Sequence, residues 1–242
     1  MSGPSDAALF EALEATWAPA GRALHEGWIL RDGAGGGKRV SAASLAAPDA
    51  PVEAAEAAMR ARGATPLFSL QPDQTGLDAD LARRGYARLD PTRIYAAASE
   101  DIARHDPAGF HAIRCAAPLG IMKEIWVVGG IGPARIAVMA RSGAARSYIL
   151  GRLSERAAGC AFVARAGGIA MLHALEVAPN FRRAGLGRTL TGAAAAWARD
   201  QGCPVFALAV TEANTGARAL YEGLGMIART HYHYRIAPEN RP

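Results

Sequence analysis

The chain has 242 residues, of which 50% are hydrophobic and 20% are charged, a composition that excludes intrinsic disorder and predicts one or two globular domains. Its net charge of +5 comes almost entirely from arginines that are spread along the sequence, so we expect no nucleic-acid partner. No apolar run reaches the ~18–20 residues of a membrane helix, and neither a signal peptide nor metal-ligand spacing of the three cysteines is visible. We therefore expect a cytoplasmic protein with no membrane partner and no metal.

In the first half, hydrophobic spacing and capping residues predict a helix, a hairpin, and then alternating helices and strands. The expected helices span residues 6–17, a short stretch after Pro19, 52–62 and 77–84, and the expected strands span 27–31, 38–44, 66–70 and a pair within 86–97. The glycine run at 33–37 predicts a hairpin tip; a phosphate loop is the alternative, but no Lys-Ser ending and no helix follow it. The composition becomes polar at 99–106, where we place a domain boundary.

The second half repeats this order. Helices are expected at 118–128, 133–141, from the end of a loop at 179–187 to 201, and at 214–224; strands are expected at 111–116, 148–153, 157–165, 169–177, 205–210 and 226–236. The strands between 148 and 177 are joined by tight turns, which predicts antiparallel neighbours.

The two halves also resemble each other in sequence. Residues 63–70 align with 202–208, and residues 81–86 align with 221–226, each time around a helix-ending glycine. This succession of helix, glycine, strand, helix, glycine and strand predicts a duplicated α+β unit. The alternative is a chance similarity between two segments rich in alanine, glycine and arginine.

The segment 175–188 has the features of an anion site. An apolar strand ends at a proline, a loop with consecutive arginines follows, and Gly185 and Gly187 precede a helix. The first turn of a helix leaves backbone N–H groups without partners and concentrates positive potential there, and glycines let an anion approach the main chain closely. The sequence therefore predicts a diphosphate site to which three arginines add charge, namely Arg182, Arg183 and Arg188.

Two well-known nucleotide-binding loops match this segment poorly. A dinucleotide fold would need a third glycine, where Leu190 stands, and a parallel strand before the loop. A nucleotide P-loop would end in Gly-Lys-Ser or Gly-Lys-Thr. A surface turn with solvated arginines remains possible on this segment alone.

Two motifs occur in order in the second half. The first is Arg182-x-x-Gly185-x-Gly187 after a Leu-x-Val-x-Pro strand end, and the second, about 30 residues later, is Asn214-x-x-Ala217-x-x-x-Tyr221-x-x-x-Gly225-Met226. Together they resemble the acyl-CoA motifs of the GNAT superfamily of N-acetyltransferases. The close resemblance covers residues 105–236.

Residues 7–97 look like a degenerate copy of the same fold, as in tandem members of that family. The first copy has no counterpart of the Arg-x-x-Gly-x-Gly loop. Where the second copy has Asn214 and Tyr221, the first has Gly76 or Leu77, and Leu81. The resemblance thus implies an N-terminal half that does not bind CoA.

The resemblance implies acetyl-CoA as a cosubstrate and implies where it binds. Its pantetheine arm would bond to the main chain of Leu175, Glu176 and Val177, where the fourth and fifth strands of the fold splay apart. The pyrophosphate would be held by the loop and the helix start, that is, by Arg182, Arg183, Ala184, Gly185, Leu186, Gly187, Arg188 and Thr189. Asn214 is expected to cap its helix and, by the resemblance, to bond the pantetheine arm as well.

The resemblance also suggests two catalytic residues. Tyr221 would protonate the departing thiolate, a role that a phenol suits; packing in the core is the alternative. Glu176 would accept a proton from the attacking amine or anchor its ammonium, although some relatives use no dedicated base. By strict alternation along the strand, Leu175, Val177 and His173 lie on the face opposite Glu176.

The acceptor is not specified by the sequence. His231 and His233 alternate with Tyr232 and Tyr234 in the last strand, so they border an acceptor pocket or pack in the core and at the surface. We expect a small-molecule or peptide amine as the acceptor and a monomer or homodimer.

The expected fold is α+β, with two tandem GNAT-like units that each have a mixed, mostly antiparallel sheet flanked by helices. The expected domains are residues 1–102, the degenerate copy, and residues 103–242, the acetyl-CoA-binding domain. The expected activity is acetyl transfer from acetyl-CoA to a primary amine by direct attack in a ternary complex. A non-catalytic acyl-CoA sensor is the alternative, and Tyr221 argues against it because binding alone needs no acid.

Overall fold

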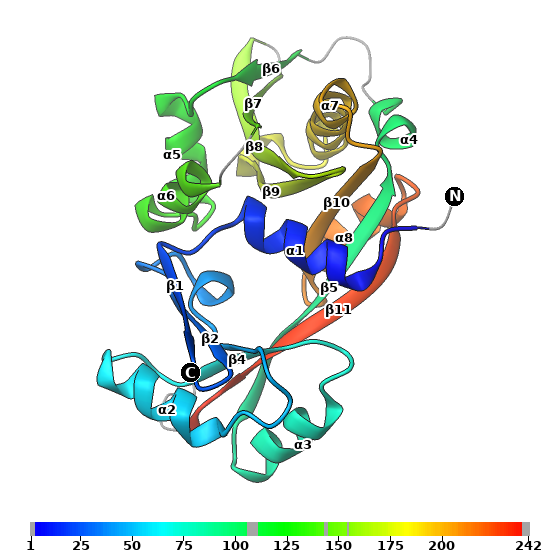
Figure 1. Cartoon of the computed structure of the whole chain (residues 1–242). Coiled ribbons are helices and arrows are strands. Elements are labelled where there is room, and N and C mark those ends of the chain that lie inside the picture. Colours follow the sequence, from blue (N-terminus) through cyan, green and yellow to red (C-terminus); the bar gives the residue numbers. More distant parts are fainter. Residues whose placement is uncertain (1–2, 106–110, 143–144, 154, 239–242) are drawn as a thin grey trace. The chain divides into compact units, whose positions relative to one another are not determined.

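A computed structural model describes residues 3–105, 111–142, 145–153 and 155–238 (Figure 1). The chain forms two compact units. Unit 1 comprises residues 1–18, 94–210 and 214–229, and unit 2 comprises residues 19–93, 211–213 and 230–242. None of the helices in the described ranges is long and apolar enough to cross a bilayer.

Unit 1 has a central sheet with helices on both faces. Its helices are α1 (Asp6–Thr16), α4 (Ser99–Ala103), α5 (Gly120–Val128), α6 (Pro133–Arg141), α7 (Leu186–Asp200) and α8 (Thr215–Glu222). Its strands are β6 (His111–Cys115), β7 (Arg146–Leu153), β8 (Arg156–Ala166), β9 (Ile169–Val177), most of β10 (Val205–Thr211), and parts of β5 (Ala87–Ala98) and β11 (Ile227–Ile236). A 3-10 turn, η2 (Pro179–Phe181), follows β9.

The sheet of unit 1 runs β5-β10-β9-β8-β7-β6. The strands from β6 to β9 are antiparallel neighbours, as expected for β7, β8 and β9, whereas β10 runs parallel to β9. A parallel neighbour requires a crossover connection, and α7 provides it by crossing from β9 to β10.

The two faces of this sheet have different cores. Helix α7 covers one face, where Leu186, Leu190 and Trp197 join the main hydrophobic cluster. Gly151 and Gly159 are cross-strand partners, and added Cβ atoms there would lie 3.0–3.1 Å from the leucines of α7. The absence of side chains on these two glycines therefore lets α7 lie close to the sheet.

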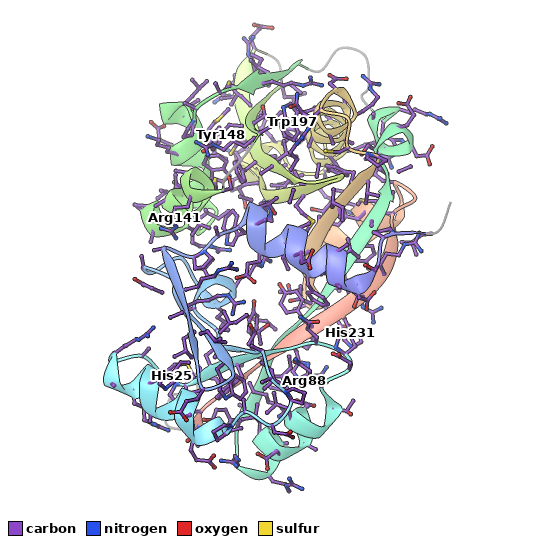
Figure 2. All side chains as sticks on the ribbon, in the orientation of Figure 1. His25, Arg88, Arg141, Tyr148, Trp197 and His231 are labelled. Carbon is purple, nitrogen blue, oxygen red and sulfur yellow. The ribbon has the colours of Figure 1, made fainter. Side chains whose placement is uncertain are left out.

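Helices α1 and α5 cover the other face of this sheet. Tyr148 lies on this face with its ring centroid 5.1 Å from that of Phe162, while Trp197 belongs to the α7 side (Figure 2). The ring of Trp17, which follows α1, lies 6.4 Å from Phe162. The first helix of the sequence thus packs in unit 1 with segments that follow residue 94.

Unit 2 is smaller. It contains β1 (Gly21–His25), β2 (Trp28–Asp32), a 3-10 turn η1 (Lys38–Val40), β3 (Ser44–Leu45), α2 (Val52–Ala61), β4 (Leu67–Leu70), α3 (Thr75–Arg83), and the remaining parts of β5 and β11. Strands β1, β2 and β3 form a three-stranded antiparallel sheet, and the other strands of the unit are ordered β4-β11-β5. The core contains Trp28, Phe68 and Leu81.

Three expectations for the first half are wrong. The stretch after Pro19 is strand β1, which pairs with β2 through a turn at Glu26 and Gly27, both with positive φ. Residues 38–40 form the turn η1, and of the strand expected at 38–44 only Ser44 belongs to a strand, β3. The expected strand pair within 86–97 is the single strand β5, whose Asp90 has a φ of 44° next to Pro91. In each case local breakers were visible, but the pairing partner was not.

The expected duplication is confirmed by the order of elements. The succession α2-β4-α3-β5 matches α7-β10-α8-β11. All four helices end at a glycine with positive φ, Gly63, Gly85, Gly202 and Gly225. In each, the N–H after the glycine bonds the carbonyl five residues earlier, as in a Schellman motif. The α+β fold with tandem units is therefore the fold of this chain.

The compact units do not divide at residue 102. The end of β5, a strand of the first half, lies next to β10 in unit 1, and the end of β11, a strand of the second half, lies next to β4 in unit 2. Each unit thus contains a strand segment from the other half of the sequence. The domains 1–102 and 103–242 remain a prediction about the two copies.

Candidate active site

The loop between β9 and α7 carries a row of free donors. Arg183 has a φ of 65° and Gly185, at the N-cap of α7, has a φ of 83°. Arg182 N–H bonds the carbonyl of Pro179, and Arg188 N–H bonds that of Gly185. Between them, the backbone N–H groups of residues 183–187 have no acceptor in the part of the chain that the structure describes.

These donors stand at the start of a 15-residue helix. Left-handed residues turn consecutive N–H groups toward one concave surface, and the helix dipole adds positive potential there. An added Cβ at Gly185 would meet no atom within 4 Å, so the loop is open at this point. This geometry suits a phosphate or another oxyanion.

Strands β9 and β10 separate next to this loop. Their parallel pairing runs from Val205 and Ile169 to Leu208 and Leu172, and stops there. Both strands continue, β9 to Val177 and β10 to Thr211. The backbone of Leu175 to Val177 is therefore not bonded to β10, which leaves one edge of β9 for a ligand, as the expected splay of these strands requires.

Glu176 lies at this strand end. Its side chain is 17% exposed, and its Oε1 accepts a bond of 2.9 Å from the guanidinium of Arg182. Nε of Arg182 also donates to the carbonyl of Val177 at 3.0 Å. Arg182, with a side chain 55% exposed, thus fixes the carboxylate and the end of β9 together.

Gly129, at the C-terminal end of α5, borders the same carboxylate. An added Cβ at this position would lie 2.4 Å from Cδ and 2.6 Å from Oε2 of Glu176. Only a residue without a side chain lets Glu176 take this position. Sequence reasoning missed Gly129, because it follows α5 and no local pattern links it to β9.

The expected placement of His173 relative to Glu176 is wrong. Ala174 has a φ of 49°, and the register with β8 shifts so that Phe162 faces His173 and Cys160 faces Glu176. This β-bulge changes the alternation and puts His173 and Glu176 on the same face, while Leu175 and Val177 pack toward α7. The indole N–H of Trp126 bonds the carbonyl of Ala174 at 2.7 Å and holds the bulge.

His173 is buried beneath α1. Its Nε2 lies 2.9 Å from Oγ1 of Thr16, and its ring lies 5.0 Å from that of Trp17. This histidine therefore lies in the core, and its partner comes from the start of the chain.

Helix α8 lies against the start of α7. A Cβ added to Gly187 would lie 3.1 Å from Leu220, and the guanidinium of Arg188 donates to the carbonyl of Gly223 at 3.4 Å and to Nδ1 of His105 at 3.2 Å. Arg188 is therefore bound to the chain, whereas Arg183 is exposed.

Asn214 caps α8, as expected. Its Oδ1 accepts a bond of 3.1 Å from the N–H of Ala217. Its NH₂ group remains on an exposed residue and is able to donate to a ligand.

Tyr221 lies two turns further along α8. It is 6% exposed and belongs to the same hydrophobic cluster as Leu175 and Val177. Burial raises the pKa of its phenol, so the hydroxyl keeps its proton at neutral pH.

Tyr95 is a second residue that sequence reasoning missed. This residue of β5 has its ring 6.4 Å from that of Tyr221, and its hydroxyl donates to Glu222 at 2.6 Å. Nε of Arg218 donates to the same hydroxyl at 3.4 Å. A strand from the first half of the sequence therefore supports α8 beside Tyr221.

Three further residues complete the comparison with the expected site. Thr189 is fully buried, and its Oγ1 has no hydrogen-bond partner among the described residues. Burial and the nearby Glu176 raise the pKa of the Cys160 thiol, and burial raises that of Cys203, as inert thiols require. No group of three possible metal ligands occurs within the described ranges.

Sequence and structure comparisons agree with this geometry. Residues 130–226 match the acetyltransferase (GNAT) family. The whole fold is similar to that of a GCN5-related N-acetyltransferase from Kribbella flavida, with a TM-score of 0.76 and 20% identity over 95% of this chain and 94% of that one. None of the curated proteins matches the chain in sequence.

Two other solved structures share the fold. One is a tandem GNAT protein from the clavulanic acid biosynthesis pathway, with a TM-score of 0.62 and 17% identity over 100% of this chain and 91% of that one. The other is an acetyltransferase of the GNAT family from Novosphingobium aromaticivorans, with a TM-score of 0.57 and 19% identity over 89% of each chain.

The parallel pair that opens beside a donor-rich helix start lies within the residues that match the acetyltransferase (GNAT) family. Residues 130–226 match the GNAT acetyltransferase family, and the chain shares the fold of solved GNAT structures, one of which is a tandem GNAT protein.

Proposed function

We propose that the protein is an N-acetyltransferase that moves the acetyl group of acetyl-CoA to a primary amine by direct attack in a ternary complex. One observation carries the proposal: the free N–H groups of residues 183–187 lie next to the point where β9 and β10 stop pairing. The free N–H groups fit a diphosphate, and the unpaired edge of β9 fits an extended arm that carries amide groups. Because open donors and an open strand edge are both present, the residues fit CoA.

The residues that would hold CoA fall into two sets. The backbone at Leu175 and Val177, with the side chain of Asn214, would bond the pantetheine arm. The pyrophosphate would lie on the donors of the loop, which is formed by Arg182, Arg183, Ala184, Gly185, Leu186, Gly187, Arg188 and Thr189. When bound, acetyl-CoA supplies an activated acyl thioester, and backbone N–H groups on the free edge of β9 polarise its carbonyl.

Glu176 would receive the proton of the acceptor amine or hold its ammonium. Arg182 occupies Oε1, and the remaining oxygen of the carboxylate is the one available to the amine. Because Gly129 borders that oxygen, the position of the carboxylate depends on α5 as well as on β9.

Tyr221 would donate its proton to the leaving sulfur. Its buried phenol remains protonated at neutral pH, and a thiolate that leaves into an apolar site needs a proton. The acceptor would be a small-molecule or peptide amine, and no metal would take part. A cytoplasmic protein that is a monomer or homodimer remains our expectation.

Two measurements test the proposal. First, we expect CoA and acetyl-CoA to raise the melting temperature of the full chain, because a ligand that binds only the folded state stabilises it. No shift at millimolar CoA would refute the cofactor. Second, thiol release from acetyl-CoA is measured with a panel of amino acids, polyamines, aminoglycosides and peptides.

The same panel of amines distinguishes the enzyme from the alternative, a non-catalytic acyl-CoA sensor. A non-catalytic acyl-CoA sensor would give the thermal shift but no amine-dependent thiol release. An enzyme would give both the thermal shift and amine-dependent thiol release. We expect at least one amine to accelerate thiol release above the rate of hydrolysis.

A further inference from the structure

The β-bulge of β9 is held by a side chain from another element. Where the register with β8 shifts, Ala174 and Leu175 of β9 face one residue of β8, so the extra residue lacks its regular ladder partner. The pairing of β9 with β10 has already stopped, at Leu172. The indole N–H of Trp126 bonds the carbonyl of Ala174 at 2.7 Å, and it thereby supplies a donor where the ladder is interrupted.

Trp126 has a fixed place in α5. Its side chain is fully buried, and its ring lies 6.3 Å from that of Tyr148 at an angle of 64°. Gly129 follows three residues later at the C-cap of α5, and positions three apart on a helix lie on one face. A Cβ added to Gly129 would contact Glu176, so α5 borders both the bulge and the carboxylate.

The bulge determines which face of β9 carries Glu176. With the bulge, Glu176 shares a face with His173, while Leu175 and Val177 pack toward α7. Without the extra residue, strict alternation would turn Glu176 toward the hydrophobic cluster under α7, because a shift of one residue moves a side chain to the other face. The bond from Trp126 therefore fixes the position of the carboxylate through the main chain.

We propose that Trp126 is a positioning residue for acetyl transfer: its indole N–H holds the bulge at Ala174 and thereby holds Glu176 beside the acceptor amine. This role rests on the proposed function, in which Glu176 receives the proton of the amine or holds its ammonium. A displacement of about 1 Å in a reacting group can cost about 100-fold in rate. A bond that holds the strand without touching the substrate is therefore sufficient to affect turnover.

Hydrogen exchange of the free full chain, measured by mass spectrometry, tests whether the bond holds the bulge. Trp126→Phe keeps an aromatic ring and removes the N–H donor. The matched control is Trp28→Phe, which removes a buried indole N–H that bonds the carbonyl of Pro51 at 2.9 Å in unit 2. We expect the amides of residues 173–177 to exchange at least tenfold faster in Trp126→Phe and within twofold of the wild-type rate in Trp28→Phe.

A double-mutant cycle tests whether Trp126 acts through Glu176, with the fastest amine of the panel as the acceptor. We expect Trp126→Phe to lower kcat about tenfold and to leave the KM for acetyl-CoA within twofold, whereas Trp28→Phe should keep the wild-type kcat. In a Glu176→Gln background, Trp126→Phe should lower kcat no further, because two residues that act through one group have non-additive effects.

Three results would overturn the positioning role and leave acetyl transfer standing. The first is unchanged hydrogen exchange at residues 173–177 in Trp126→Phe. The second is a cycle in which the effects of Trp126→Phe and Glu176→Gln on kcat multiply, and the third is a wild-type kcat in Glu176→Gln. In contrast, a wild type without amine-dependent thiol release would refute the proposed function and the positioning role together.

A second variant covers the case in which Trp126→Phe does not fold. Trp126→benzothienylalanine keeps the size of the bicyclic ring and replaces its N–H group by sulfur. We expect the same faster exchange at residues 173–177 and the same loss of kcat in this variant. Exchange and kcat equal to those of the wild type would show that the N–H group does not position Glu176.

Discussion

The two copies within this chain share their helix ends and differ at their helix starts. Helices α2 and α7 both end in a Schellman motif at a glycine with positive φ. Before α7, Arg183 and Gly185 are left-handed and free N–H groups face outward; before α2, the N-cap is Pro51, which has no N–H and whose carbonyl accepts the indole N–H of Trp28. The first copy therefore shares the order of elements, but its N-cap before α2 contributes no backbone N–H donor.

The second pair of helices repeats this contrast. Gln74 stands at the N-cap of α3, and Asn214 stands at the N-cap of α8. The structural counterpart of Asn214 is thus Gln74, and the expected match with Gly76 or Leu77 is wrong by two or three residues. Leu81 occupies the position of Tyr221, and both are buried. Under the proposed function, a few residues at helix starts would separate a copy that binds the cofactor from a copy that does not.

The largest effect is expected when the donors of the loop before α7 are blocked by a negative charge. We expect Gly185→Asp to weaken CoA binding at least 100-fold, because a carboxylate would stand where the pyrophosphate binds. The left-handed φ of 83° strains any side chain at this position, although Asp is among the residues that visit this conformation, so we expect a small fall in melting temperature. Calorimetric titration with CoA measures the effect.

Gly202→Asp is the matched control for that variant. It introduces the same charge at a left-handed glycine with free space, at the opposite end of α7. CoA affinity within threefold of wild type is expected. If both variants bind CoA like wild type, the loop is not the phosphate site.

The second prediction concerns Tyr221, whose counterpart in α3 is an apolar leucine; Tyr221→Phe makes this position of α8 apolar as well. We expect Tyr221→Phe to lower kcat about 100-fold, at the lower end of the range for general acid–base catalysis, and to leave the Kd for CoA within twofold. The phenyl ring keeps its packing against Tyr95, so the loss reports the hydroxyl. Steady-state kinetics with an active amine measures it, and an unchanged kcat would remove the acid role.

The third prediction concerns Glu176, whose side chain has room only because residue 129 is a glycine. Gly129→Ala should displace the carboxylate and lower kcat about tenfold, with CoA binding intact, since the added Cβ would lie 2.4 Å from Cδ of Glu176. Glu176→Gln should lose a similar factor. Gly132→Ala, in the same loop with no atom within 4 Å of the added Cβ, is the control and should keep full activity. Activity of Gly129→Ala equal to that of Gly132→Ala would contradict the role of Glu176.

The smallest effect is expected in unit 2, where an ion pair stabilises the fold. Arg235 first, and His233 as well, lower the pKa of Asp78 from 3.8 to about 2. A lowered pKa in the folded state stabilises the protein above the unfolded pKa, and this stability is lost as the pH falls from about 4 to about 2. After solvent screening we expect about 1 kcal/mol.

Urea unfolding at several pH values measures this contribution. At pH 6, Asp78→Asn should be less stable than wild type by about 1 kcal/mol, and the difference should vanish near pH 2. Asp73→Asn, at an exposed position just before α3, is the control and should show no such pH dependence. A difference that persists at pH 2 would show that the ion pair is not its source.

Much of the fold could be predicted from local patterns. Hydrophobic spacing located α2, α3, α7 and α8 but not α4, and the glycines at 63, 85, 202 and 225 marked the ends of those four helices. The prediction of a helix at β1 was wrong because this strand is exposed along most of its length. Its sequence therefore lacks the alternation of apolar and polar residues that marks a half-buried strand. The strand expected at 38–44 was too long, because the sequence does not show at which residue strand pairing begins.

The site was predicted in part. The loop, Asn214 and Tyr221 are in the places that the two motifs indicate, whereas Gly129 and Tyr95 could not be found, because each touches the site from a distant segment. The face of His173 was predicted wrongly, since a bulge at Ala174 adds one residue to the alternation and no local sequence pattern announces it.

The sequence by itself determined most of the helices, their glycine ends and the position of the loop before α7, because periodicity, capping and left-handed turns depend on residues within a few positions of one another. Only the tertiary structure decided that β5 lies beside β10, that β11 lies beside β4, and that α5 and α1 enclose the face of Glu176 and His173. The physical reason is that strand pairing and face packing join distant segments, and any exposed strand edge offers the same backbone groups. The choice of partner therefore depends on the packing of the whole unit.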